Sequence, residues 1–173
     1  MPSPYTAPLS LRHLIPDDAA VFWRLTDSVA RERRYLAYPE FSQAQSAAYV
    51  SRQLEQNAPH LLLLDGDQVV GWCDIQPHAS PFYRHGGVLG IGLLPSHRGM
   101  GLGGWLLENT LEVARQRGYR RVELTVHADN LRAQRLYQRH GFKLEGRKQN
   151  AICLDGHFQD VLQMARWLAD NAS

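Results

Sequence analysis

The segment Pro95-Ser96-His97-Arg98-Gly99-Met100-Gly101-Leu102-Gly103-Gly104 decides the fold that this chain of 173 residues is predicted to adopt. It lies between an apolar run typical of a strand, Gly87 to Leu94, and residues with helical spacing, Leu102 to Gln116. Its glycines leave backbone N–H groups uncrowded, and the first turn of a helix offers unpaired donors and the positive end of the helix dipole. We therefore expect this segment to bind phosphate.

A tight turn without a ligand is the plainest alternative interpretation of these glycines. Glycine adopts backbone conformations that other residues rarely adopt, so a glycine cluster needs no ligand to explain it. Arg98 places a cation beside the glycines, which favours an anion. A P-loop is excluded, because that motif ends in Gly-Lys-Ser/Thr and here Gly104 is followed by Trp105.

A dinucleotide-binding fingerprint is a more serious rival. Gly99, Gly101 and Gly104 fit the pattern G-x-G-x-x-G, and Glu123 lies about 20 residues further on. In that motif the glycines begin at the end of a strand, whereas here they begin five residues after Leu94. The remaining chain is also too short for the later strands of a doubly wound domain. A dinucleotide oxidoreductase is therefore kept only as the weakest functional alternative.

The rest of the chain predicts an α/β mixed sheet with helices packed on it. Asp65-Gly66 and Asp155-Gly156 are hairpin signals between apolar runs. Propensity would make Val161 to Asp170 helical, but the alternation from Phe158 to Met164 favours a strand. The expected strands are Leu9 to Leu14, His60 to Leu64, Gln68 to Ile75, Gly87 to Leu94, Val122 to Val126, Phe142 to Leu154 and His157 to Trp167, and the expected helices are Pro16 to Ala30, Ser42 to Asn57, Leu102 to Gln116 and Asn130 to Gly141.

Composition limits the class of protein. A single domain over residues 1–173 is expected, because 44% hydrophobic residues suffice for one core. A formal net charge of +2 gives no argument for nucleic acid or an anionic membrane as partner. Cys73 and Cys153 are too few for a disulfide framework, the eight histidines lack metal-ligand spacing, and the longest aliphatic run, Leu61 to Leu64, cannot span a bilayer. We expect a cytoplasmic protein without a metal.

Arg98, Gly101 and Gly103 fit the pattern Gln/Arg-x-x-Gly-x-Gly/Ala, and here the chain resembles the GCN5-related N-acetyltransferase (GNAT) superfamily. The resemblance is specific over about Gly87 to Trp167 and generic before it. It implies the GNAT fold, with a central, mostly antiparallel twisted sheet of about seven strands, splayed central strands and about four flanking helices. The further matches, in the family's order, are Leu93-Leu94-Pro95, Val122 to Val126, Asn130, Leu136-Tyr137, Gly141-Phe142 and Glu145-Gly146.

The resemblance also implies acetyl-CoA as the donor substrate. Pantetheine would lie along Gly92 and Leu93 in the splayed gap, and the N–H near Leu93 would serve as an oxyanion hole for the acyl carbonyl. Asn130 resembles a residue that contacts the pantetheine arm, and N-capping of a helix is its alternative role. The implied donor-binding residues are Leu93, Leu94, Pro95, Arg98, Gly99, Met100, Gly101, Leu102, Gly103, Gly104, Asn130 and Tyr137.

Two catalytic roles follow from the same resemblance. Tyr137 matches the tyrosine that protonates the leaving thiolate, and its alternative is a core aromatic on an amphipathic helix. The family often places a basic glutamate on the strand that is here Gly87 to Leu94, but this strand contains no carboxylate. Asp74 is the first candidate to replace it, and a solvent-facing strand residue is its alternative role. His85, Glu123 and a water chain remain candidates for the base.

The acceptor is expected to bind to the first half of the chain. Tyr35, Tyr38, Glu40 and Asp74 would offer aromatic walls and carboxylates to a primary amine of a small molecule. The whole pattern is similar to the YhhY-like branch that acetylates free amino acids. Polyamine and ribosomal-protein N-terminal acetyltransferases stay open, as does a CoA-binding module without catalysis. A homodimer is a further option, for which the sequence offers only aromatics such as Trp105 and Trp167.

Overall fold

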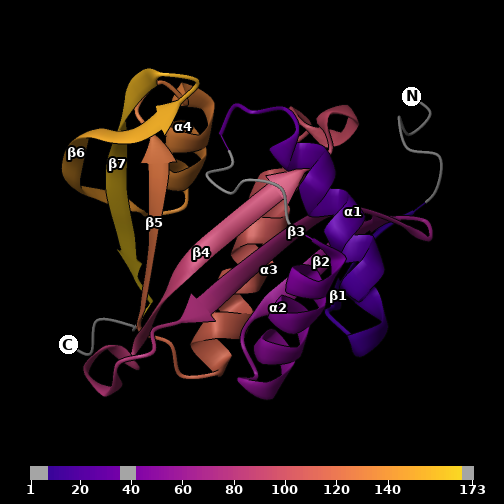
Figure 1. The fold of residues 1–173 in the computed structure, drawn as a ribbon. Coiled ribbons are helices and arrows are strands. Elements are labelled where there is room, and N and C mark those ends of the chain that lie inside the picture. Colours follow the sequence, from indigo (N-terminus) through magenta and orange to yellow (C-terminus); the bar gives the residue numbers. More distant parts are fainter. Residues whose placement is uncertain (1–7, 36–41, 169–173) are drawn as a thin grey trace.

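The computed structural model describes residues 8–35 and 42–168 and shows one seven-stranded sheet with helices on both faces (Figure 1). The strand order is β1-β2-β3-β4-β5-β7-β6, and every neighbouring pair is antiparallel except β4 and β5. The predicted mixed, mostly antiparallel fold is confirmed. The strands are β1 (Leu9–His13), β2 (His60–Asp65), β3 (Gln68–Pro77), β4 (Gly86–Leu93), β5 (Arg121–His127), β6 (Lys143–Leu154) and β7 (His157–Trp167), and the helices are α1 (Ala19–Ala30), α2 (Gln43–Glu55), α3 (Leu102–Gln116) and α4 (Leu131–Arg139).

Local signals fix most helix ends where they were predicted. The Ser42 hydroxyl accepts from the backbone N–H of Gln45, and the Gln45 side chain accepts from the Ser42 N–H, so a capping box begins α2. Gly118 follows α3 with a φ of +85°, a conformation that favours glycine. Three predicted ends differ, because Pro16–Asp18 forms a 3-10 turn before α1, and α2 and α4 end at Glu55 and Arg139, ahead of the predicted Asn57 and Gly141. None of the helices in the described ranges has both the length and the apolar character needed to cross a bilayer.

Two apolar clusters cover opposite faces of the sheet. Successive strand residues point to opposite faces, so Cys73 and Ile75 of β3 face α3 and α4, while Trp72 faces α1 and α2. The same alternation places Asp74 on the face that α1 and α2 cover. A polar residue on β3 therefore lies beneath two helices.

The sheet opens between β4 and β5. These strands pair only from Gly86 to Val88, and the rest of β4 diverges (Figure 1). On its other edge β4 stays bonded to β3, where the Leu94 N–H donates to the Val70 carbonyl at 2.9 Å. Antiparallel bonding alternates along a strand, so the backbone groups of Ile91 and Leu93 face the gap. The predicted splay thus exposes part of one strand edge.

Gly92 allows β4 to pass beside Trp72. A Cβ at position 92 would lie 2.2 Å from Cη2 of Trp72, so one of the two must move. We expect Gly92→Ala to lower the free energy of unfolding by about 1–3 kcal/mol, the usual cost of overpacking, as measured by urea denaturation. Gly146→Ala in β6 is the control, because its Cβ would meet nothing within 4 Å. Equal stability of the two variants would contradict this packing role.

Candidate active site

The glycine loop has the geometry of an anion site. Gly99 and Gly101 have φ values of +84° and +80°, and α3 begins at Leu102 without a side-chain cap. Trp105 donates to the carbonyl of Gly101, so the N–H groups of Leu102 and Gly103 precede the first helical hydrogen bond. The turn thus presents unpaired donors at the positive end of α3, beside the gap in the sheet.

Arg98 is bound by the protein itself. Its guanidinium donates to the Leu93 carbonyl at 2.9 and 2.7 Å and forms a bidentate pair with Glu32 at 2.8 and 2.7 Å. The pair lowers the pKa of Glu32, chiefly through the hydrogen bond from Arg98. Arg98 therefore ties the end of β4 to the segment after α1, whereas the sequence suggested a cation placed for phosphate.

Two other predicted donor-site residues have clear structural roles. The Asn130 side chain accepts from the backbone N–H of Ala133 at 3.2 Å, so the predicted N-cap of α4 is confirmed. Gly104 lets α3 approach His140, whose Nε2 lies 2.9 Å from where a Cβ would stand. These roles leave their contacts with the donor as predictions.

Tyr137 is buried in the core cluster that α3 and α4 share, with 8% of its surface exposed. Its ring meets Phe142 edge-on at 5.8 Å. Burial raises the pKa of its hydroxyl above the ordinary value of 10.0, and repulsion from an ionised Cys73 would raise it further. The phenol is therefore protonated at neutral pH, as a proton donor must be.

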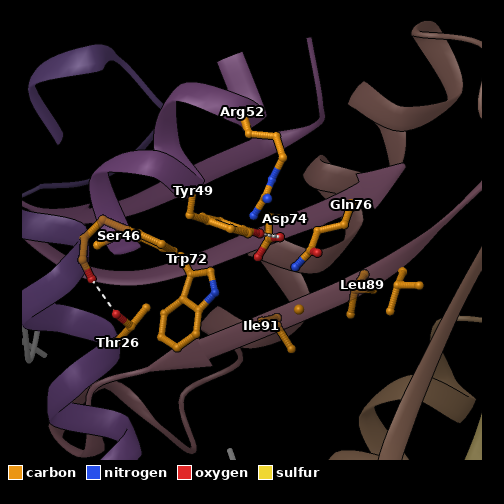
Figure 2. A pocket seen from close by; sticks show the side chains of 12 residues that line it. Thr26, Ser46, Tyr49, Arg52, Trp72, Asp74, Gln76, Leu89 and Ile91 are labelled. Carbon is orange, nitrogen blue, oxygen red and sulfur yellow. Dashed lines mark hydrogen bonds between the residues drawn. The ribbon is translucent and has the colours of Figure 1, made fainter. Parts of the chain in front are cut away.

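A cavity of about 220 Å³ lies between the first two helices and the strands β3 and β4 (Figure 2). Asp74 lies in it with 2% of its surface exposed, which shows that the solvent-facing alternative was wrong. The cavity is lined by Phe22 and Thr26 of α1, Ser46, Tyr49 and Arg52 of α2, Trp72, Asp74 and Gln76 of β3, and Val88, Leu89, Gly90 and Ile91 of β4.

The surroundings of Asp74 suit a general base. Burial raises its pKa from 3.8 to about 7, and a hydrogen bond from the Tyr49 hydroxyl to Oδ2 opposes that rise. Gln53 donates to the oxygen of Tyr49 at 3.1 Å and so helps to orient it. A base is most effective when its pKa lies close to the working pH. Asp74 meets that condition without a neighbouring carboxylate.

Gly90 explains how a carboxylate can act from β3 when β4 has none. Gly90 pairs directly with Asp74, and its missing Cβ would lie 3.0 Å from Oδ1 of Asp74. A side chain at position 90 would fill the space into which Oδ1 points. The lack of a side chain at Gly90 on β4 therefore leaves the space that the Asp74 carboxylate on β3 occupies.

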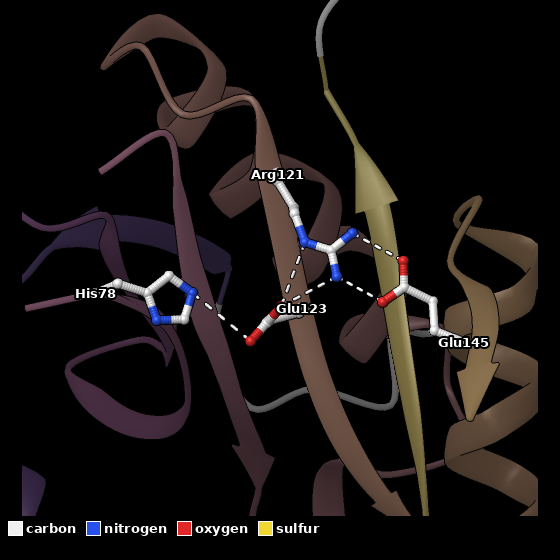
Figure 3. Close-up of polar contacts among 4 residues, drawn as sticks. All are labelled: His78, Arg121, Glu123 and Glu145. Atoms are coloured by element: carbon white, nitrogen blue, oxygen red, sulfur yellow. Dashed lines mark hydrogen bonds and ion pairs between the residues drawn. The ribbon is translucent and has the colours of Figure 1, made fainter. Parts of the chain in front are cut away.

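Glu123, another candidate for the base, is already bound. Its carboxylate lies 3.1 Å from the Arg121 guanidinium and 3.6 Å from Nε2 of His78, and Arg121 also binds Glu145 (Figure 3). Its oxygens are therefore already occupied, and Glu123 does not line the cavity that contains Asp74.

Of the predicted acceptor residues that the structure describes, Asp74 lines the cavity and Tyr35 does not. Tyr35 packs edge-on against His127 at the end of β5, with ring centroids 5.5 Å apart, and does not line the cavity around Asp74. Tyr38 and Glu40 lie outside the described residues.

The sequence reasoning missed Tyr49 and Arg52, although the polar spacing of Ser46, Tyr49 and Gln53 on one face of α2 was a usable signal.

The sheet that opens between β4 and β5 and the glycine turn beside this gap agree with the fold of the family that the sequence resembles. The profile of the family described as "Acetyltransferase (GNAT) family" matches residues 22–142. The chain therefore belongs to this family. In the described residues, no group of three or more His, Cys, Asp or Glu side chains could hold a metal ion.

Curated relatives and solved structures agree on the family. The chain is 31% identical to a mycothiol acetyltransferase from Renibacterium salmoninarum over 78% of this chain, but it spans only 40% of that protein. It is 31% identical to the L-amino acid N-acetyltransferase AaaT from Escherichia coli over 60% of this chain and 64% of the relative. A GNAT-family acetyltransferase structure from Streptococcus pneumoniae is 29% identical, with a TM-score of 0.86 over 92% of this chain and 99% of that one.

A structure with bound acetyl-CoA confirms the fold. The protein YncA from Salmonella typhimurium, solved with its cofactor acetyl-CoA, has a TM-score of 0.89 over 96% of this chain and 98% of that one. At 18% identity this likeness concerns the fold alone.

Proposed function

We propose that this protein moves the acetyl group of acetyl-CoA to the primary amine of a small molecule, in a single N-acetyltransferase domain formed by residues 1–173. The observation that carries this proposal is the buried Asp74 carboxylate in a cavity against the splayed strand β4. The unpaired N–H groups at the start of α3 would hold the pyrophosphate, and the backbone of Ile91 and Leu93 would face the pantetheine.

The proposed reaction is a direct attack by the amine. Asp74 takes a proton from the ammonium group, and the neutral nitrogen forms a bond to the thioester carbonyl carbon while the N–H of Leu93 stabilises the oxyanion. The C–S bond then breaks, and Tyr137 gives its proton to the thiolate. The proton held by Asp74 and the second proton lost by the amide nitrogen pass to solvent, and solvent returns one to Tyr137.

We propose a free amino acid as the acceptor, as in the YhhY-like branch. The relative named as an L-amino acid N-acetyltransferase supports this choice. The relatives named mycothiol acetyltransferase favour a second candidate, a larger amine, but the chain spans only 40% of the first of them. Polyamines and ribosomal-protein N-termini stay as further candidates.

The test is an acetyl-CoA-dependent thiol-release screen across amino acids, polyamines, aminoglycosides and peptide N-termini. We expect acetyl-CoA to raise the Tm, and at least one amine, with amino acids foremost, to be acetylated. A Tm shift without any turnover would identify a CoA-binding module instead. No Tm shift with any acyl-CoA would contradict the proposed function altogether.

The Tyr49 hydroxyl provides a test of Asp74 through pH. Its hydrogen bond lowers the pKa of Asp74, so Tyr49→Phe removes a group that favours the ionised form. We expect the acid limb of kcat/KM to move to higher pH by about 1–2 units, as for a hydrogen bond to a charged group. Tyr83→Phe, on a residue 59% exposed, is the control. An unmoved acid limb in Tyr49→Phe would show that another group is the base.

A further inference from the structure

The cavity around Asp74 is also lined by an exposed cation, Arg52, which has no partner in the part of the chain that the structure describes. Arg52 lies in the last turn of α2 and lines this cavity, and Figure 2 shows its side chain extending toward Tyr49 and Asp74. Its guanidinium lies 5.7 Å from the centre of the Tyr49 ring. Across the described residues 8–35 and 42–168, nothing accepts a hydrogen bond from Arg52 or forms an ion pair with it within 4.0 Å.

Stacking on Tyr49 holds the guanidinium near the reacting centre while its donors stay available. Tyr49 bonds to Asp74, so the same ring connects the cation to the base. Arg98, by contrast, has its donors bound by Glu32 and Leu93. A planar fork of N–H groups without a protein acceptor is suited to a carboxylate, which it binds through two parallel hydrogen bonds.

We infer that Arg52 binds the α-carboxylate of the acceptor, and that the substrate class is free α-amino acids with an apolar side chain. The inference rests on the proposed function and specifies its acceptor. The amine would lie against Oδ1 of Asp74 over Gly90, and the carboxylate would lie against Arg52. The side chain would then contact the apolar wall of Phe22, Trp72, Val88, Leu89 and Ile91.

The charges of the cavity disfavour the other acceptors. A polyamine would bring a second cation toward Arg52, and among the residues that the structure describes, no carboxylate besides Asp74 lines the cavity. A peptide N-terminus carries an amide where an amino acid carries its carboxylate, so it would leave the guanidinium without its charged partner. Arg52 thus favours free amino acids over amines that lack the α-carboxylate.

The test compares L-leucine with L-leucinamide, which differ only in that group. The amide has the lower amine pKa, so more of it is neutral near pH 7.5, and any preference for the acid must come from binding. We expect the wild type to favour leucine in kcat/KM by about 10- to 100-fold, as for a charge-assisted bidentate contact. In Arg52→Gln this ratio should fall to about 1, mainly through the KM for leucine, with Arg52→Lys in between.

Arg24→Gln is the matched control, because it removes the same charge from an exposed site on α1 outside the cavity. Its ratio should equal that of the wild type. Calorimetric titration of leucine into each protein measures the same contact without turnover, and an unchanged Tm shift with acetyl-CoA shows that each variant is folded.

The outcomes separate the two proposals. Acetylation of leucine and leucinamide at equal rates by the wild type, or an unchanged ratio in Arg52→Gln, would overturn the role of Arg52 and leave the acetyltransferase activity standing. Leucine binding that depends on Arg52, without acetylation of any amine, would support the carboxylate site and contradict the proposed reaction.

Discussion

Replacing Asp74 with Asn should lower kcat for amine acetylation by about 10²–10⁴-fold, the usual contribution of a general base. The amide keeps the shape of the carboxylate and can still accept from Tyr49, but it cannot take a proton from the ammonium group. Binding of acetyl-CoA should be unchanged, because the glycine loop precedes α3 and none of its residues lines the cavity around Asp74. Asp67→Asn, on an exposed turn residue, is the control.

The pH dependence should change in the same variant. In the wild type, activity should rise with pH through the pKa of Asp74, about 7, because only the ionised form accepts a proton. Asp74→Asn should lack this acid limb. A variant that keeps both the rate and the limb would assign the base to His85 or to a water chain.

The stability of the fold should change with pH in the opposite direction to the activity, again because of Asp74. The folded pKa of about 7 lies above the unfolded value of 3.8, so the folded state binds more protons between these values. The free energy of unfolding should therefore fall as pH rises from about 4 to 7, and this fall should be absent in Asp74→Asn. Urea denaturation at pH 5 and pH 8 measures it. A fall of equal size in both proteins would mean that Asp74 is not the group that causes it.

The parts of the fold that short-range signals determine were predictable from the sequence. Asp155-Gly156 forms the turn between β6 and β7, and Gly66 begins the turn that follows Asp65 at the end of β2. Both glycines have positive φ values. The glycine loop is equally local, since its turn and the helix that follows are adjacent in the chain. Such signals need no knowledge of what packs against them.

The acceptor side required contacts that sequence spacing does not reveal. Tyr49 reaches Asp74 across 25 residues, because α2 packs on the face of β3 that carries the carboxylate. The strand pattern left two roles open for Asp74, a base or a solvent-facing residue, and the helices packed over the sheet bury it. Likewise, Arg98 pairs with Glu32 across 66 residues. Long-range packing thus determines which charged side chains are bound by other parts of the protein.

The second large effect is expected at Tyr137. Tyr137→Phe should lower kcat by about 10²-fold, near the lower end of general-acid contributions, because a thiolate with a pKa near 8.5 leaves more readily than an alkoxide. The KM for acetyl-CoA and the Tm should change little, since the ring keeps its contact with Phe142. Tyr119→Phe is the control, because that hydroxyl is also partly buried, with a raised pKa, but lies outside α4.

A direct readout of the acid role is the alkaline side of the pH profile. The pKa of Tyr137 is raised above 10.0 by burial, so its phenol stays protonated across the assay range and the wild-type rate should show no alkaline limb below about pH 10. Tyr137→Phe should lower the whole plateau without moving the acid limb that Asp74 sets. Unchanged turnover in Tyr137→Phe would make this tyrosine a core aromatic, and the thiolate would then leave without a protein acid.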